Sequence, residues 1–141
     1  MADRINLSSS QIRYLLAMRA LSDKNGAIRS ARLASELGCS KPSVHTMIRT
    51  LSAMDLVKKE PYGAVYFTLP GKKTAEQYAQ YYDAVRNVLG EYTKTDGAEA
   101  EEAICALLAG MTEECLKELC LNRQTKLNGK VQNKLAESQV N

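Results

Sequence analysis

The sequence has few of the residues from which catalytic and metal centres are commonly built. It contains a single histidine, His45, and its four cysteines form no Cys-x-x-Cys pair, so zinc-finger spacing is absent. No Gly-rich phosphate loop, nucleophile–base pair or paired-carboxylate motif appears in a supporting context. We therefore expect a protein that is not an enzyme.

Long apolar runs are absent as well. No stretch approaches the length of a membrane-spanning helix, and the first ten residues lack the apolar centre of a signal peptide. We therefore expect a cytoplasmic protein with no membrane partner and with reduced cysteines. At 141 residues, of which 45% are hydrophobic, the chain is long enough to bury a core.

Charge is distributed unevenly along the chain. Residues 1–73 hold twelve Lys/Arg against five Asp/Glu, residues 74–122 hold three against ten, and residues 123–141 hold four against one. A basic front half suits a polyanion such as DNA, which would repel the acidic rear half. The same distribution also fits two solvated surfaces without a ligand, so charge alone leaves both interpretations open.

Apolar spacing and capping residues predict three helices and a hairpin in the first 73 residues. The first helix follows a serine run at 8–10, the second is capped by Ser30 and ends at Gly38, and the third begins at Ser40 with Pro42 in its first turn. Residues 28–29 are expected to form a short extended link. Two short strands follow, at 56–59 and 64–68, joined by a turn that contains Pro and Gly.

The second and third predicted helices form a helix-turn-helix. Val44, Met47, Ile48 and Leu51 make an apolar stripe for the core, and the opposite, polar face of the third helix would lie in the major groove. The hairpin would form a wing along the DNA backbone. Together with the basic charge, this favours a DNA-binding winged helix over a purely structural one. The candidate DNA-binding residues are Ser40, Lys41, Pro42, Ser43, His45, Thr46, Arg49, Lys58, Lys59 and Tyr62.

The rear half is predicted to be helical. A long helix from Gly71 to about Leu89 is followed by a helix at 98–110 and by a last helix that Thr112 caps. The long helix carries a stripe at the spacing of a helix that packs on another helix, and we expect this stripe to form a homodimer interface: Tyr78, Tyr82, Val85 and Leu89.

The predicted fold class is therefore mainly α. A winged helix-turn-helix domain, with three helices and a two-stranded wing, would occupy residues 1–73. A helical dimerisation domain would occupy residues 74–122, and residues 123–141 would form a polar, flexible tail.

Three segments carry a family resemblance: LASELGCSKPSV at 33–44, EPYG at 60–63 and LPGKK at 69–73. They resemble the diphtheria toxin repressor and manganese transport regulator family, and the similarity extends from about residue 11 to residue 120. The resemblance implies a homodimeric, metal-responsive repressor of metal-uptake or redox genes that binds double-stranded DNA. It also implies that Ser40, Pro42 and Thr46 contact bases and that Ser43 contacts a phosphate.

The resemblance implies a manganese or iron site too, but its ligand positions hold other residues in this sequence. The family's ligands on the first, long and following helices fall on Arg13, Leu16, Tyr82, Cys105, Leu108 and Ala109. Hard Mn²⁺ prefers carboxylate and imidazole, which one thiolate cannot replace. We therefore expect a DNA-binding regulator without a cofactor.

Two alternatives stay open. In the first, Glu102 and Cys105, with or without a cysteine of the last helix, build a new site for a transition metal such as zinc or iron. In the second, the winged helix is an interaction module that docks protein, and the charge asymmetry serves assembly. Elemental composition would test the first alternative, and salt-dependent DNA binding would test the second.

Overall fold

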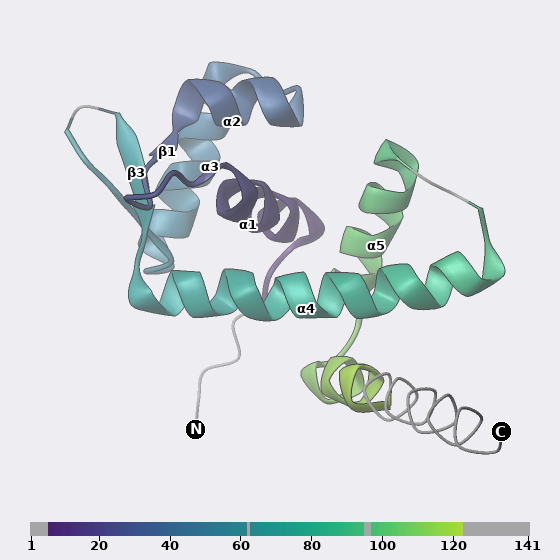
Figure 1. The fold of residues 1–141 in the computed structure, drawn as a ribbon. Coiled ribbons are helices and arrows are strands. Elements are labelled where there is room, and N and C mark those ends of the chain that lie inside the picture. Colours follow the sequence, from purple (N-terminus) through teal and green to yellow (C-terminus); the bar gives the residue numbers. More distant parts are fainter. Residues whose placement is uncertain (1–5, 62, 95–96, 123–141) are drawn as a thin grey trace, which may run out of the picture.

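The computed structural model describes residues 6–61, 63–94 and 97–122. In chain order the elements are α1 (Ser9–Leu21), β1 (Ile28–Arg29), α2 (Ser30–Leu37), α3 (Lys41–Ala53), β2 (Val57–Lys59), β3 (Ala64–Phe67), α4 (Leu69–Tyr92) and α5 (Ala98–Gly110). Residues 113–122 are helical as well. Figure 1 shows the first three helices and the sheet over the N-terminal part of α4, with α5 beside its C-terminal part. The predicted mainly α fold with a winged helix-turn-helix is confirmed.

Local capping signals place most of the helix ends. The Ser8 hydroxyl accepts the Gln11 backbone N–H, and the Gln11 side chain accepts the Ser8 N–H at 2.9 Å, which closes a capping box at the start of α1. At the end of α2, Gly38 has a φ of 64°, a conformation that glycine adopts at little cost. The prediction that Ser30 caps α2 is wrong, because Arg29 is the N-cap residue and makes no side-chain capping bond.

The wing belongs to a three-stranded antiparallel sheet in the order β1-β3-β2. The hairpin of β2 and β3 is present, with Val57 opposite Phe67. The segment expected to be a link is strand β1, in which Ile28 lies opposite Val65. The predicted two-stranded wing is therefore present, and what the sequence did not predict is that β1 joins its sheet as a third strand. Burial of Ile28 and Val65, both 0% exposed, is what attaches this two-residue strand to the sheet.

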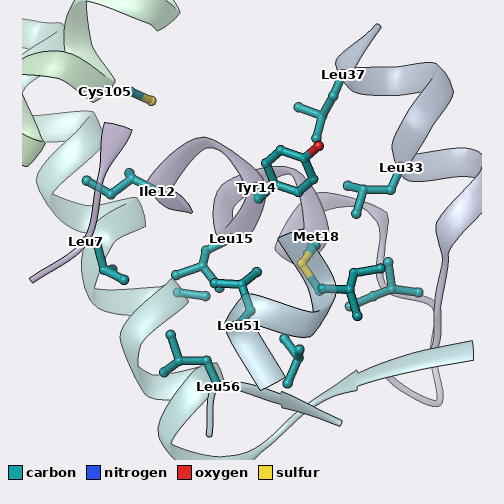
Figure 2. Close-up of a cluster of buried hydrophobic side chains, with 14 of the residues drawn as sticks. Leu7, Ile12, Tyr14, Leu15, Met18, Leu33, Leu37, Leu51, Leu56 and Cys105 are labelled. Atoms are coloured by element: carbon teal, nitrogen blue, oxygen red, sulfur yellow. The ribbon is translucent and has the colours of Figure 1, made fainter. Parts of the chain in front are cut away.

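The core of the front half is built around α1. Ile12, Leu15 and Met18 of α1 are all 0% exposed, and Figure 2 shows side chains of the neighbouring elements, among them Leu33 and Leu51, converging on this helix. The apolar stripe of α3 joins the same cluster. Burial of the stripe fixes how α3 is rotated about its axis, so its polar residues must face outward.

The long helix is joined closely to the base of the wing. It begins at Leu69, two residues before the predicted start, because the Thr68 hydroxyl accepts the Gly71 N–H at 3.0 Å and so acts as N-cap. The same hydroxyl donates to the Asp55 carbonyl at 2.6 Å. A Cβ atom on Gly71 would lie 1.7 Å from the carbonyl oxygen of Leu56, so only glycine fits this contact.

The rear half packs against the same core. Of the predicted dimer stripe, Val85 is 4% exposed, and Tyr78, Tyr82 and Leu89 are half-buried and packed against the core of their own chain. Thr112 caps the helical segment 113–122 as predicted, since its hydroxyl accepts the Cys115 N–H at 3.1 Å. In the described part of the chain, no helix has the length and apolar character that crossing a bilayer requires. The predicted tail at 123–141 lies outside the described residues.

Candidate nucleic-acid interface

The outward face of α3 gathers most of the predicted DNA-binding residues. Seven of them are exposed on this helix or at its cap: Ser40, Lys41, Pro42, Ser43, His45, Thr46 and Arg49. Val44, Ile48 and Leu51 point the other way and are at most 1% exposed. The helix is therefore held from behind by apolar contacts, and its polar face is free to meet a ligand.

The hydroxyl groups on this face are partly occupied by the helix itself. Ser40 is the N-cap of α3, and its Oγ accepts the Ser43 N–H at 3.3 Å and lies 2.8 Å from the Ser43 Oγ. The Thr46 hydroxyl donates to the Pro42 carbonyl at 3.0 Å. While that bond is made, Thr46 offers a DNA base its acceptor oxygen and its methyl group, and donation to a base would require the hydroxyl to leave the Pro42 carbonyl.

Two cations on α3 are available for DNA. In residues 6–61, 63–94 and 97–122, neither Lys41 nor Arg49 forms an ion pair, and both side chains are exposed. A guanidinium in this position has the fork of donors that matches O6 and N7 of guanine in the major groove. An ammonium at the start of the helix suits a backbone phosphate. The face therefore combines a group that can read bases with groups that can bind phosphate.

The wing brings one further positive charge, that of Lys59, to the outward face of α3. Lys58 and Lys59 are exposed at the end of β2. The Nζ of Lys59 lies 3.0 Å from Nδ1 and 3.4 Å from Nε2 of His45 on α3. Tyr62, predicted to lie in the wing, is outside the described residues. The structure thus brings Lys59 of the wing to the recognition helix, a contact between residues fourteen positions apart in the sequence that no local pattern indicated.

The positions that the family resemblance assigns to metal ligands lie between α1, α4 and α5, and their chemistry does not fit manganese or ferrous iron. Arg13 of α1 carries a positive charge, and its Nε lies 3.9 Å from Glu101 Oε1 of α5. Burial raises the pKa of the Cys105 thiol to about 11, with a further contribution from the Glu101 charge, so the group is neutral at pH 7. Burial likewise raises the pKa of Tyr82, and the Glu101 charge adds to the effect. A guanidinium is no ligand for a cation, and a single thiol with a phenol does not supply the carboxylate and imidazole groups that these cations prefer.

The alternative site at Glu102 and Cys105 gains no further donors. Glu102 is exposed, whereas Cys105 is 1% exposed, and no three His, Cys, Asp or Glu side chains lie together among the residues that the structure describes. A cavity of about 1290 Å³ opens between the C-terminal half of α4 and α5, and residues of both charges line it, among them Arg13, Arg86, Asp83 and Glu101.

Sequence reasoning missed three features that bear on the site. They are strand β1, the Arg13–Glu101 ion pair and the contact between His45 and Lys59. Each joins residues that are far apart in the sequence. The sequence held one signal of the Arg13–Glu101 pair. Arg13 stands where the resembled family has an acidic metal ligand, and no partner had been predicted for its positive charge.

Comparison with known proteins agrees with this geometry. Residues 6–65 match the family described as the iron-dependent repressor, N-terminal DNA-binding domain. The chain is 33% identical to the transcriptional regulator MntR of Escherichia coli over 64 residues, which are 45% of this chain and 41% of that relative. It therefore spans less than half the length of this curated relative, which is named as a transcriptional regulator and not as an enzyme.

Solved structures share the fold at low sequence identity. The IdeR protein of T. acidophilum superposes with a TM-score of 0.60 and 17% identity, over 84% of this chain and 55% of that one. The manganese regulator SloR superposes with a TM-score of 0.63 and 20% identity, over 77% of this chain and 51% of that one. The likeness extends beyond the winged helix into the helical rear half.

Proposed function

We propose that the protein is a cytoplasmic transcriptional regulator that represses its targets by binding double-stranded DNA, and the match of residues 6–65 to the DNA-binding domain of the iron-dependent repressor family supports the proposal. The observation that carries the proposal is the outward face of α3, where Lys41 and Arg49 are exposed. Burial of Val44 and Ile48 anchors this face to the core. A helix held in this way can enter the major groove without rearrangement.

An Arg49→Ala variant tests the reading role of α3. If the guanidinium pairs with a guanine, the loss of binding free energy should be about 1–3 kcal/mol and confined to one operator position. Affinity would be measured on duplexes selected by the protein from a random pool. Arg86→Ala, which removes an exposed arginine from the acidic half, is the matched control and should bind as the wild type does. Equal binding by Arg49→Ala at every operator position would remove Arg49 from the interface.

An interaction module that docks protein is the rival function. DNA binding that neutralises several phosphates releases counterions, so the logarithm of the affinity falls steeply with the logarithm of salt concentration. Retention on duplex DNA at low salt, with steep loss on raising it, supports the regulator. Salt-insensitive or absent retention contradicts the regulator and supports the rival.

We also propose that DNA binding does not require manganese or iron. Leu16 and Leu108, at two positions of the resembled ligand set, pack into the core, and Arg13 pairs with Glu101. These contacts hold α1 against α5 without a cation, so the DNA-competent arrangement needs no metal to populate it. Affinity for selected duplexes would be measured after chelation and again with added manganese, iron or zinc. A gain of tenfold or more, about 1.4 kcal/mol of coupling, contradicts the proposal. A gain with zinc alone supports the rebuilt site at Cys105.

The homodimer is supported by apolar surface on the rear half. Val88, Tyr92, Leu107 and Leu121 are large hydrophobic residues that stay exposed, between 36% and 80%, in the single chain. A second copy that covers them would pair the two recognition helices about a two-fold axis, and such a dimer prefers near-palindromic DNA with half-sites about one helical turn, or a multiple, apart. A dimer contact made by the predicted stripe on α4, which runs from Tyr78 to Leu89, stays a prediction. A monomer at micromolar concentration in sedimentation would contradict the dimer.

A further inference from the structure

One contact links the wing directly to the recognition helix. Lys59 is the last residue of β2, and His45 lies in the second turn of α3. The Lys59 ammonium lies 3.0 Å from the nearer imidazole nitrogen, Nδ1. Both side chains are exposed, and both lie on the basic surface proposed above to meet DNA. The contact is therefore made by two groups that DNA could reach.

The chemistry of the pair assigns a direction to the contact. An ammonium group only donates hydrogen bonds, so in this contact the Lys59 ammonium is the donor and the imidazole ring, with Nζ 3.0 Å from Nδ1 and 3.4 Å from Nε2, is the accepting partner. On the exposed face of α3, His45 places an acceptor within reach of the Lys59 ammonium, whereas the exposed basic residues Lys41 and Arg49 would repel it. His45 thus attracts a lysine to a helix face that otherwise carries like charge.

We infer that His45 is a positioning residue, which holds the Lys59 ammonium beside α3 so that the wing and the recognition helix present one continuous basic surface to the DNA backbone. The inference rests on the proposed DNA-binding function. A free lysine side chain loses rotamer freedom when a phosphate immobilises it, and the contact with His45 removes part of that loss before DNA arrives. In the complex with DNA, Lys59 binds the phosphate and His45 orients the Lys59 side chain.

This assignment differs from a base-reading role for His45 in three measurable ways. Loss of the imidazole should weaken DNA binding about three- to tenfold, the range expected when one long side chain is no longer held in place. It should leave the salt dependence unchanged, because Lys59 still reaches the phosphate in the complex. It should also have no effect once Lys59 is gone, because the histidine then has nothing to position.

The test is a double-mutant cycle with His45→Ala, Lys59→Ala and the double variant, on a fluorescent mixed-sequence duplex about three helical turns long. Lys59→Ala should lower the slope of log affinity against log salt by about 0.9, the value for one phosphate contact. The double variant should match Lys59→Ala alone. His45→Gln, whose amide oxygen can accept the same hydrogen bond, should restore most of the affinity. Lys58→Ala is the matched control on the same strand and should add independently to His45→Ala.

The outcomes separate this inference from the proposed function. If the wild type fails to bind the duplex, the proposed function itself fails. If the wild type binds but the effects of His45→Ala and Lys59→Ala add, or if His45→Ala lowers the salt slope, then His45 contacts DNA on its own and the positioning role is refuted. Thermal denaturation of each variant checks folding, which exposed positions should leave unchanged.

Discussion

Gly71 offers the sharpest test of how the winged helix is joined to the long helix. A Cβ atom at this position would lie 1.7 Å from the carbonyl oxygen and 2.6 Å from the carbonyl carbon of Leu56. Both are backbone atoms, and the carbonyl is held further by the Thr68 N–H at 3.1 Å. Neither can rotate away as a side chain would. Gly71→Ala must therefore push α4 away from the base of β2.

The magnitude follows from two opposed effects. Inserting a methyl group into a packed site costs about 1–3 kcal/mol, and more where the surroundings cannot yield. Replacing glycine by alanine inside a helix returns about 0.5–1 kcal/mol of backbone entropy. Since the clash is with backbone, we expect Gly71→Ala to lower the free energy of unfolding by about 2 kcal/mol or more.

Gly90 in the same helix provides the matched control. A Cβ there would meet nothing within 4 Å, so Gly90→Ala should raise the free energy of unfolding by about 0.5–1 kcal/mol. Urea unfolding followed by circular dichroism measures both variants. If Gly71→Ala proves as stable as the wild type, α4 does not approach Leu56 as closely as the structure indicates, and the argument for a fixed junction fails.

The remaining predictions concern a helix cap and the buried thiol. Ser40→Ala removes the N-cap of α3 and should cost about 1 kcal/mol in urea unfolding, whereas Ser52→Ala near the other end of the helix should change stability by less than about 0.5 kcal/mol. Iodoacetamide at neutral pH should modify the exposed Cys115 well before Cys105, as peptide mapping would show; equal rates would contradict the burial of Cys105. Because folding raises the Cys105 pKa from 9.0 to about 11, the stability from its neutral thiol is complete below pH 9 and is lost as pH rises to 11. Cys105→Ala should flatten that alkaline decline, and an unchanged decline would assign it to other groups.

The sequence by itself determined the local elements. Ser8 and Ser40 cap their helices, Gly38 ends α2, and the stripe that includes Val44 and Ile48 is buried, all as the spacing predicted. These features depend on residues within about one turn of each other, so the chain near them contains the whole signal. The exposed face of α3 could be predicted for the same reason, because it is the complement of the buried stripe.

Tertiary structure alone decided which elements meet. A two-residue strand such as β1 has no periodicity to read, and its place in the sheet comes from the burial of Ile28 beside Val65. The link from His45 to Lys59 spans fourteen residues, so no local pattern could indicate it. The stripe on α4 is similar: spacing shows that a face will be buried, but it does not say whether the covering surface belongs to the same chain. Val85 is already buried within its own chain, in which both α1 and α5 pack on α4.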